Sequence, residues 1–175
     1  MKLLFHVCCG PCFVYPLATV RKTNNIEITA YFFNPNIHPY EEFVKRVESF
    51  KKYCDAESVS CVICDSYEPH RYVEKIGKNL DNRCFVCYEL RLQETAEYAL
   101  KNGFDCFTTS LLVSPYQKHD MIKETGKRIA EEVGLSFYYE DWRPGYVFGR
   151  QKAKEHGLYN QKYCGCFYSE FESHR

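Results

Sequence analysis

The sequence lacks any apolar segment that approaches the roughly 20 residues of a membrane-spanning helix. Residues 1–7 are likewise too short a run for the hydrophobic core of a secretory signal. Net charge is also missing, because 23 Lys and Arg residues balance 23 Asp and Glu residues. No global positive field favours nucleic acid, and no acidic excess favours disorder. We therefore expect a cytoplasmic protein with no membrane partner, in which charge-based recognition is local.

Internal repeats, low-complexity tracts and long linkers are absent as well. A chain of 175 residues is long enough for one sizeable core and too short for two ordinary domains. We expect one domain, 1–175, with an α/β core over 1–141 and a C-terminal segment over 142–175. Beyond Trp142 the sequence loses clear periodicity, so this segment is expected to pack over the domain or near its site.

Strands and helices alternate in the expected secondary structure. Strands are expected at 2–7, 27–33, 59–64, 105–109 and 135–139, and helices at 13–21, 41–53, 69–76, 81–101 and 117–132. Asp81 or Asn82 is expected to cap the longest helix. This alternation predicts a mostly parallel, twisted sheet with helices on both faces. Ligands of such sheets bind at the carboxyl ends of the strands, where the loop after residue 7 emerges.

Cysteine is abundant: the 11 cysteines are about 6% of the chain, below the roughly 8–10% of a small disulfide scaffold. A reducing cytosol keeps most thiols free, so metal or redox chemistry is the leading explanation. The first cluster, Cys8, Cys9 and Cys12, lies where a strand gives way to a helix. Backbone amides and the helix dipole there favour thiolate, the form that ligates metals. The alternative is that one of these cysteines merely packs under the helix.

The second cluster is Cys84 and Cys87, three residues apart on the first turn of the long helix, with Arg91 one turn further along the same face. Such a pair alone is a zinc half-site, a redox pair or a packing feature. Together with Cys8 and Cys9 it supplies four thiolates, which suits zinc or an iron–sulfur cluster. The spacing of the cysteines does not distinguish a zinc site from an iron–sulfur cluster.

The third cluster is Cys164 and Cys166, separated by one glycine. Such a pair can close into a strained disulfide that is easily reduced, and thereby store two electrons. Two metal ligands or an idle reduced pair are the alternatives.

Four other cysteines carry weaker signals. Cys61 and Cys64 lie in an expected strand, where side chains three apart point to opposite faces, so with Cys54 they favour a structural role. Cys106 is expected to be a buried small hydrophobic residue.

The stretch from Trp142 to Tyr163 has five basic residues against one acidic residue. The basic residues are Arg143, Arg150, Lys152, Lys154 and Lys162, and they alternate with Trp142, Tyr146, Phe148, Tyr159 and Tyr163. Basic side chains follow a phosphate backbone and aromatic faces stack on unpaired bases, so this combination fits a single-stranded RNA loop. A solvated charged surface with its aromatic rings in the core explains the composition equally well.

In these motifs the sequence resembles the cobalamin-independent epoxyqueuosine reductases, the QueH family. The resemblance covers nearly the whole chain and is carried by His6–Cys12, by Asp81–Tyr88 with Arg91 and Leu92, and by Cys164–Ser169. It implies a nucleotide-hydrolase-like, Rossmann-like α/β fold. It also implies a 4Fe–4S cluster and the last step of queuosine biosynthesis, the reduction of epoxyqueuosine to queuosine at the wobble position of a tRNA anticodon.

The resemblance also implies roles for individual residues. The implied cluster ligands are Cys8, Cys9, Cys84 and Cys87. The implied redox-active pair is Cys164 and Cys166, which an unidentified electron donor reduces again after each turnover. Cys12 and Asp81 are candidates to hold a second, mononuclear iron. His6, Asp81, Tyr88 and Arg91 are candidate proton donors or charge stabilisers because they are close in sequence to these cysteines.

Two other functions compete with this interpretation. In the first, four thiolates hold a zinc ion that staples an RNA-binding module without chemistry. In the second, the chain is a cytosolic thiol oxidoreductase, although it has many more cysteines than one working pair needs. Iron and acid-labile sulfide content would distinguish all three.

Overall fold

A computed structural model describes residues 1–78 and 80–174. One five-stranded sheet forms its centre, with strand order β3-β2-β1-β4-β5, and every neighbouring pair is parallel. The strands are β1 (Lys2–His6), β2 (Glu27–Phe32), β3 (Ser60–Ile63), β4 (Cys106–Thr109) and β5 (Ser136–Phe137). The central position of β1 fits its apolar sequence, because a parallel strand between two others is buried on both faces. The mostly parallel α/β fold class expected from the sequence is confirmed.

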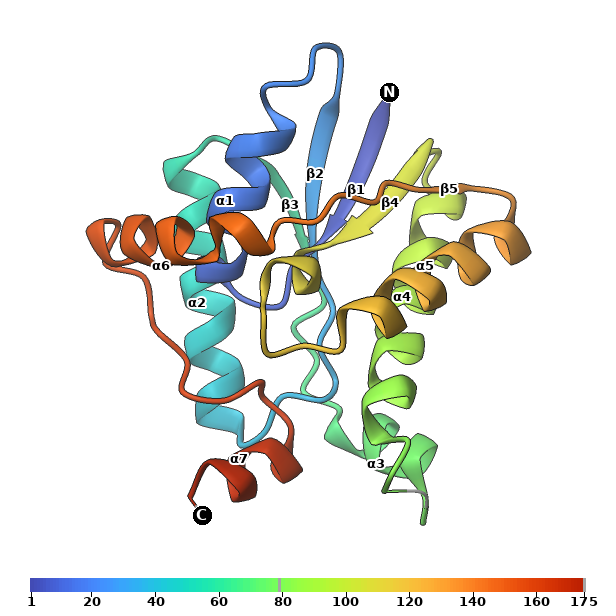
Figure 1. Ribbon diagram of the computed structural model, residues 1–175, viewed down its shortest axis with the longest axis vertical. Coiled ribbons are helices and arrows are strands. Elements are labelled where there is room, and N and C mark those ends of the chain that lie inside the picture. The colour runs from blue at the N-terminus through green and yellow to red at the C-terminus, as the bar shows by residue number, and fades with distance from the viewer. Residues whose placement is uncertain (79, 175) are drawn as a thin grey trace.

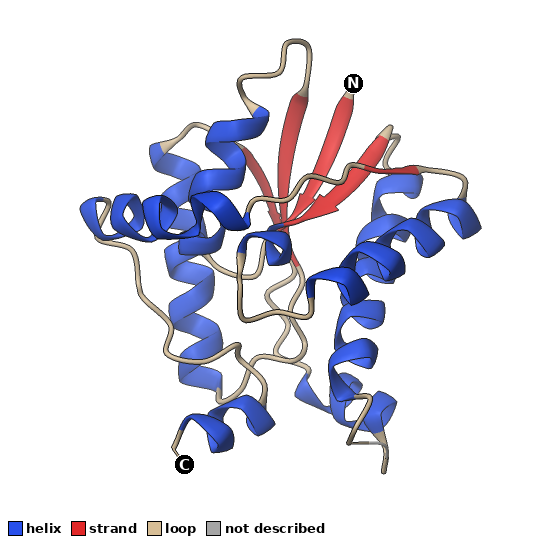
Figure 2. Cartoon of the chain, viewed as in Figure 1, coloured by secondary structure: helices blue, strands red, loops and turns tan. Residues whose placement is uncertain are grey.

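Helices cover both faces of this sheet (Figure 1). Helices α1 (Gly10–Val20) and α2 (Tyr40–Ala56) lie on one side, and α4 (Arg83–Lys101) and α5 (His119–Val133) lie on the other. The short α3 (Pro69–Ile76) packs against α4, and α6 (Tyr146–Glu155) packs against α1. The loops at the carboxyl ends of the strands converge on the lower half of the view in Figure 2, where α7 (Phe167–Ser173) also lies.

Aromatic rings fill much of the core between β1 and the helices. The ring of Phe5 lies 5.0 Å from that of Phe13 and 5.3 Å from that of Trp142, measured between centroids. All three side chains are fully buried. Trp142 therefore anchors the start of the C-terminal segment in the core, and it is not available to stack on RNA bases.

The structure corrects several expected boundaries. Helix α1 begins at Gly10 rather than at Phe13, which brings Cys12 into its first turn. Helix α4 begins at Arg83 with Asn82, one of the two expected residues, at its N-cap position, although the Asn82 side chain makes no capping hydrogen bond. Helices α6 and α7 fall in the segment where the sequence shows no clear periodicity.

None of the helices in residues 1–78 and 80–174 combines the length and apolar character that crossing a membrane requires.

Candidate functional site

The first cysteine cluster lies at the carboxyl end of β1, the central position in the sheet. The Sγ atoms of Cys8, Cys9 and Cys12 all lie within 4.8 Å of one another, and all three residues are buried. Gly10 permits the start of α1 to pack closely against α2, because a Cβ at residue 10 would lie 2.6 Å from the backbone oxygen of Ser49 on α2. The close approach of α1 to α2 thus gathers three thiols in one place, as metal ligation requires.

The three thiols differ in the direction in which their pKa values are shifted. Hydrogen bonds from Cys12 and Cys9 hold the pKa of Cys8 well below its usual value, and the charge of Arg91 lowers it further. Burial raises the pKa of Cys9 to about 12, and the hydrogen bond to Cys8 raises the pKa of Cys12 well above its usual value. The metal-free cluster therefore favours one negative charge, and a metal must displace the protons that remain.

Two polar residues that the sequence analysis missed contact this cluster. Gln161 donates from Nε2 to the sulfur of Cys9 at 2.9 Å and lies 3.5 Å from that of Cys12. Ser110, directly after β4, donates its hydroxyl to the sulfur of Cys8 at 3.5 Å and accepts from the Cys8 backbone at 3.1 Å. Neither contact has a local sequence signal, since both join segments that are more than 100 residues apart.

The second cluster occupies the first turns of α4, as expected. Burial raises the pKa of Cys84, and it raises that of Cys87 to about 11. The guanidinium of Arg91 lies 3.7 Å from the sulfur of Cys87 and donates to Asn34 Oδ1 at 2.6 Å. Arg91 is only 3% exposed, and its Nε has no hydrogen-bond partner. A buried cation facing sulfur and an amide favours an anionic centre beside it.

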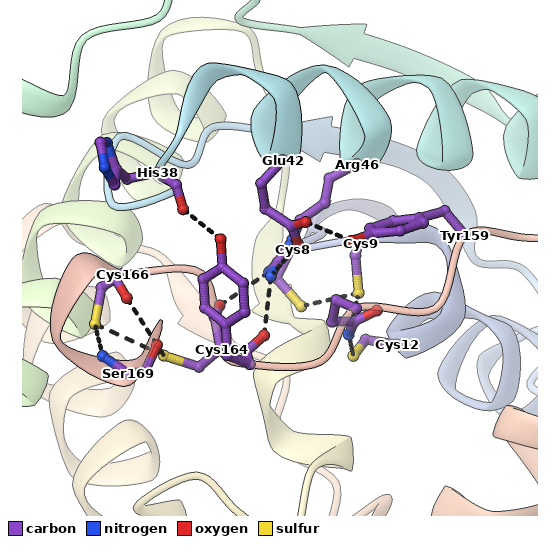
Figure 3. A network of polar contacts seen from close by, with 12 residues as sticks. Cys8, Cys9, Cys12, His38, Glu42, Arg46, Tyr159, Cys164, Cys166 and Ser169 are labelled. Carbon is purple, nitrogen blue, oxygen red and sulfur yellow. Dashed lines mark hydrogen bonds and ion pairs between the residues drawn. The ribbon is translucent and has the colours of Figure 1, made fainter. Parts of the chain in front are cut away.

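Arg46 of α2 holds the backbone of the third cluster. This buried guanidinium donates to the carbonyl oxygens of Cys164 and Tyr163, each at 2.9 Å. Its Nε donates to Glu42 at 2.7 Å. The backbone of His38 adds a 2.8 Å hydrogen bond to the carbonyl of Gly165. In Figure 3, Arg46 lies between the group of three cysteines and the C-terminal segment.

The two C-terminal thiols lie side by side. Their Sγ atoms are 3.9 Å apart, and Cys164 Sγ lies 3.0 Å from the hydroxyl of Ser169. The hydrogen bond from Cys164, supported by the hydroxyl and backbone N–H of Ser169, lowers the pKa of Cys166 to about 5. The intervening Gly165 has φ +120°, a conformation that a side chain disfavours. Cys166 is therefore a thiolate at neutral pH, poised against its neighbouring thiol.

One pocket of about 600 Å³ joins the three clusters. Its lining includes Cys8 and Cys12 of the first, Cys84 of the second, and Cys164 and Cys166 of the third. Asp81 lines the same pocket.

The remaining two expected cluster ligands, Cys9 and Cys87, are buried and do not belong to the lining of this pocket. Cys9 is 1% exposed and Cys87 is 8% exposed. Within the described residues, the one group of three or more potential ligands close enough for a metal is Cys8, Cys9 and Cys12. The participation of Cys84 and Cys87 therefore stays a prediction, and the structure adds Cys12 to the closest group.

Two of the four candidate proton donors are engaged elsewhere. His6 is fully buried, and its ring nitrogens lie 2.8 Å from Thr109 Oγ1 and 3.2 Å from the carbonyl of Phe33. Burial lowers the pKa of His6 to about 3, so its ring is neutral. The hydroxyl of Tyr88 donates to Gln117 at 2.7 Å. The hydrogen-bond partners of His6 and Tyr88 therefore lie outside the three cysteine clusters.

The cysteines outside the three clusters do not join the site. Cys54 and Cys106 are buried in the core, as a structural role requires. Cys61 packs on the same core, while Cys64 donates to the hydroxyl of Tyr31 at 3.3 Å. Cys54 and Cys61 are neighbours, and this proximity helps to raise the pKa of Cys54, after burial as the first cause.

Part of the basic stretch is also engaged within the protein. Arg143 pairs with Asp141 at 2.6 Å, and Lys152 pairs with Glu155 at 2.6 Å. Arg150 instead lies over an aromatic ring on the pocket wall. Any RNA surface must therefore be centred on the pocket rather than on the whole stretch.

Comparison with known proteins identifies the family of this chain. A family model described as "Epoxyqueuosine reductase QueH" matches residues 3–172. A relative of that name from Dehalococcoides mccartyi is 37% identical over 171 residues, covering 98% of this chain and 93% of the relative. Another, from Thermotoga maritima, is 34% identical over 180 residues, covering 97% and 91%.

A solved structure shows the fold at greater distance. The crystal structure titled "deacetylase-bog complex in biosynthesis pathway of teicoplanin" has a TM-score of 0.50 and 10% identity, and the match covers 89% of this chain and 83% of the deacetylase. At that identity the likeness extends to the fold alone. The sequence relatives and the family model go further, and they show that this chain belongs to the epoxyqueuosine reductase QueH family.

Proposed function

We propose that this chain is an oxidoreductase of tRNA processing that reduces epoxyqueuosine to queuosine at the wobble position of the anticodon. One observation carries the proposal: cysteines from all three clusters line a single pocket of about 600 Å³. Family membership names the reaction, and the pocket supplies thiols of the kind that such a reaction needs. Since tRNA is the substrate, the proposed place of action is the cytoplasm.

In this proposal Cys8, Cys9, Cys84 and Cys87 hold a 4Fe–4S cluster. The donor set fits, because Cys8 and Cys9 belong to a compact buried sulfur group and Cys84 lines the same pocket. The buried guanidinium of Arg91 beside Cys87 offsets the negative charge that such a centre carries. When bound, a cluster of this type supplies electrons one at a time.

Cys12 and Asp81 are the proposed ligands of a second, mononuclear iron. Both line the pocket, and neither belongs to the four proposed cluster ligands. A thiolate and a carboxylate together suit an iron that keeps open coordination positions.

The proposed reaction balances with one dithiol. Removing the epoxide oxygen to leave an alkene consumes two electrons and two protons and releases water. Oxidation of the Cys164 thiol and the Cys166 thiolate to a disulfide releases two electrons and one proton, and the second proton comes from solvent. The 3.9 Å separation of their sulfur atoms favours that bond, and an external reductant must then restore the pair.

Other residues of the pocket position the dithiol and stabilise its thiolate. Arg46 fixes the backbone that carries the dithiol, and Ser169 stabilises the Cys166 thiolate. Asp81 is exposed at the pocket, and proton delivery from solvent is the alternative to its role as an iron ligand.

The test uses protein purified without oxygen and tRNA that bears epoxyqueuosine. Conversion is measured by mass spectrometry of the nucleosides after digestion, together with iron, acid-labile sulfide and zinc content. We expect iron, sulfide and repeated turnover with a chemical reductant, and loss of repeated turnover in the Cys164→Ser/Cys166→Ser double variant. A colourless protein with one zinc and no sulfide, or an iron-loaded protein that leaves epoxyqueuosine unchanged, would contradict the proposal.

A further inference from the structure

An exposed tyrosine stands at the mouth of the cysteine pocket. Tyr116 is 82% exposed, the largest value among the exposed large hydrophobic residues of the described chain. Its ring meets that of Tyr146 edge-on, with 5.8 Å between centroids and 80° between planes. Both residues line the pocket. The high exposure of Tyr116 leaves a face of its ring open to solvent, and an open aromatic face is a surface on which a planar group can stack.

The loop that carries Tyr116 is fixed in place. The backbone N–H of Tyr116 donates to Ser114 Oγ at 3.3 Å. On the other side of the loop, the hydroxyl of Tyr88 donates to Gln117 and accepts from the backbone N–H of Lys118, at 2.7 Å and 3.2 Å. Tyr88 belongs to α4, the helix of the second cysteine pair. The open ring is thus held relative to the cysteines before any ligand arrives, which lowers the entropic cost of binding.

Positive charge lines the same pocket as this ring. Three basic side chains of the pocket make no ion pair within the described residues: Lys118, Arg150 and Lys162. The guanidinium of Arg150 lies 6.0 Å from the centroid of the Tyr146 ring. Of the two acidic side chains on the pocket wall, Glu172 is neutralised by an arginine, which leaves Asp81. The rim is therefore complementary to phosphate groups.

The pocket has the size of a site for one small molecule, since such sites span about 300–1,000 Å³. A single nucleoside fits in this volume, whereas a stacked helix does not. Open aromatic faces beside unpaired cations are typical of proteins that bind bases splayed out of single-stranded RNA loops.

We propose that Tyr116 stacks on the base of the substrate nucleotide after that nucleotide has left the stack of an RNA loop. Tyr146 fixes the orientation of the Tyr116 ring, and Lys118, Arg150 and Lys162 contact the neighbouring phosphates. The form that binds is therefore a nucleotide within a loop rather than a free base or nucleoside. This inference rests on the proposed function, and it assigns the substrate contacts that the function leaves open.

The test is a double-mutant cycle on RNA affinity, measured by fluorescence anisotropy with the full chain. The two probes are an anticodon stem–loop with guanosine at the wobble position and the same stem–loop with an abasic site there. For the wild type we expect the abasic site to weaken binding about five-fold or more, the effect of losing one stacked base. Tyr116→Ala should weaken binding of the intact loop by a similar factor and remove the difference between the probes.

Three controls separate stacking from other effects. Tyr116→Phe keeps the ring and should bind both probes like the wild type. Phe148→Ala removes a half-exposed ring of α6 that does not line the pocket, and it should also leave both affinities unchanged. Lys162→Glu should weaken both probes equally and flatten the salt dependence.

The inference is overturned if Tyr116→Ala binds the intact loop as tightly as the wild type, or if it still distinguishes the abasic probe. It is also overturned if free guanosine competes with the intact loop at equal concentration. The failure of the proposed function has a different signature: the iron-loaded wild type leaves epoxyqueuosine in tRNA unchanged while the anisotropy results stand.

Discussion

Replacing Arg91 by methionine removes a buried positive charge and keeps a side chain of similar length. In the part of the chain that the structure describes, the guanidinium contacts Cys87 Sγ at 3.7 Å and Asn34 Oδ1 at 2.6 Å. Its charge also acts on Cys8 and lowers the pKa of that thiol. Arg91 is thus the cation that two separate cysteine clusters share.

The expected effect follows from the distance to Cys87. Two unit charges about 4 Å apart interact by about 4 kcal/mol at an effective dielectric constant of 20. Since 1.4 kcal/mol is a factor of ten, the loss of Arg91 weakens metal binding through that thiolate by up to about three orders of magnitude. The metal-free protein loses mainly the hydrogen bond to Asn34, which costs about 1–3 kcal/mol.

The assay compares iron and sulfide content after anaerobic reconstitution, before and after exposure to a chelator, with the thermal unfolding of the metal-free protein. We expect Arg91→Met to fold and to lose its iron rapidly, and Arg91→Lys to retain an intermediate amount because the charge stays. Arg71→Met is the matched control, since Arg71 is half exposed, pairs with Glu68 and Glu94, and does not contact the three clusters. If the Arg91→Met variant retains as much iron as the wild type after exposure to the chelator, the electrostatic reasoning is refuted.

Three further predictions concern the dithiol and the core. The rate at which iodoacetamide alkylates Cys166, followed by peptide mass spectrometry, should rise with pH through about 5, because that pKa governs the thiolate fraction. In Cys164→Ala the inflection should move up toward 9.0, and an unchanged profile would contradict the role of the Cys164 thiol. Gly165→Ala forces a side chain into φ +120° and within 3.0 Å of Arg46, so its thermal midpoint should fall by the equivalent of about 1–3 kcal/mol; a midpoint equal to the wild type would contradict the strain argument. Trp142→Phe should lower the free energy of unfolding by about 1–3 kcal/mol and leave tRNA affinity unchanged. A loss of tRNA affinity without a loss of stability would instead indicate that Trp142 contacts RNA.

Local signals in the sequence were enough to predict the sheet and the positions of the three cysteine clusters. Strand β1 ends at His6, two residues before Cys8, and α4 begins one residue before Cys84, so the first two cysteine clusters could be placed from periodicity alone. The convergence of the clusters on one pocket could be anticipated only in part, because it also depends on how the C-terminal segment folds back.

Other features had no signal in the sequence. Helix α6 contains Gly149, which reads as a poor helix former, yet a Cβ there would lie 3.1 Å from Tyr15 on α1, so close packing explains the glycine. Trp142 lies among basic residues, so the sequence is equally compatible with an exposed and a buried side chain. In the structure Trp142 is fully buried. Tyr116 gains its significance only from the pocket beside it, which no local pattern reveals.

The anchoring of the C-terminal segment has a consequence for protein engineering. Arg46 and the backbone N–H of His38 donate to main-chain oxygens of residues 163–165, and the one side chain of that stretch that returns a hydrogen bond to His38 is Tyr163, through its hydroxyl. The backbone contacts do not depend on the side chain of residue 164, so selenocysteine in place of Cys164 leaves them intact and alters only the chalcogen. Position 164 is therefore the place where electron-transfer chemistry can be exchanged, whereas Tyr163 is held by its hydroxyl and Gly165 by its backbone conformation.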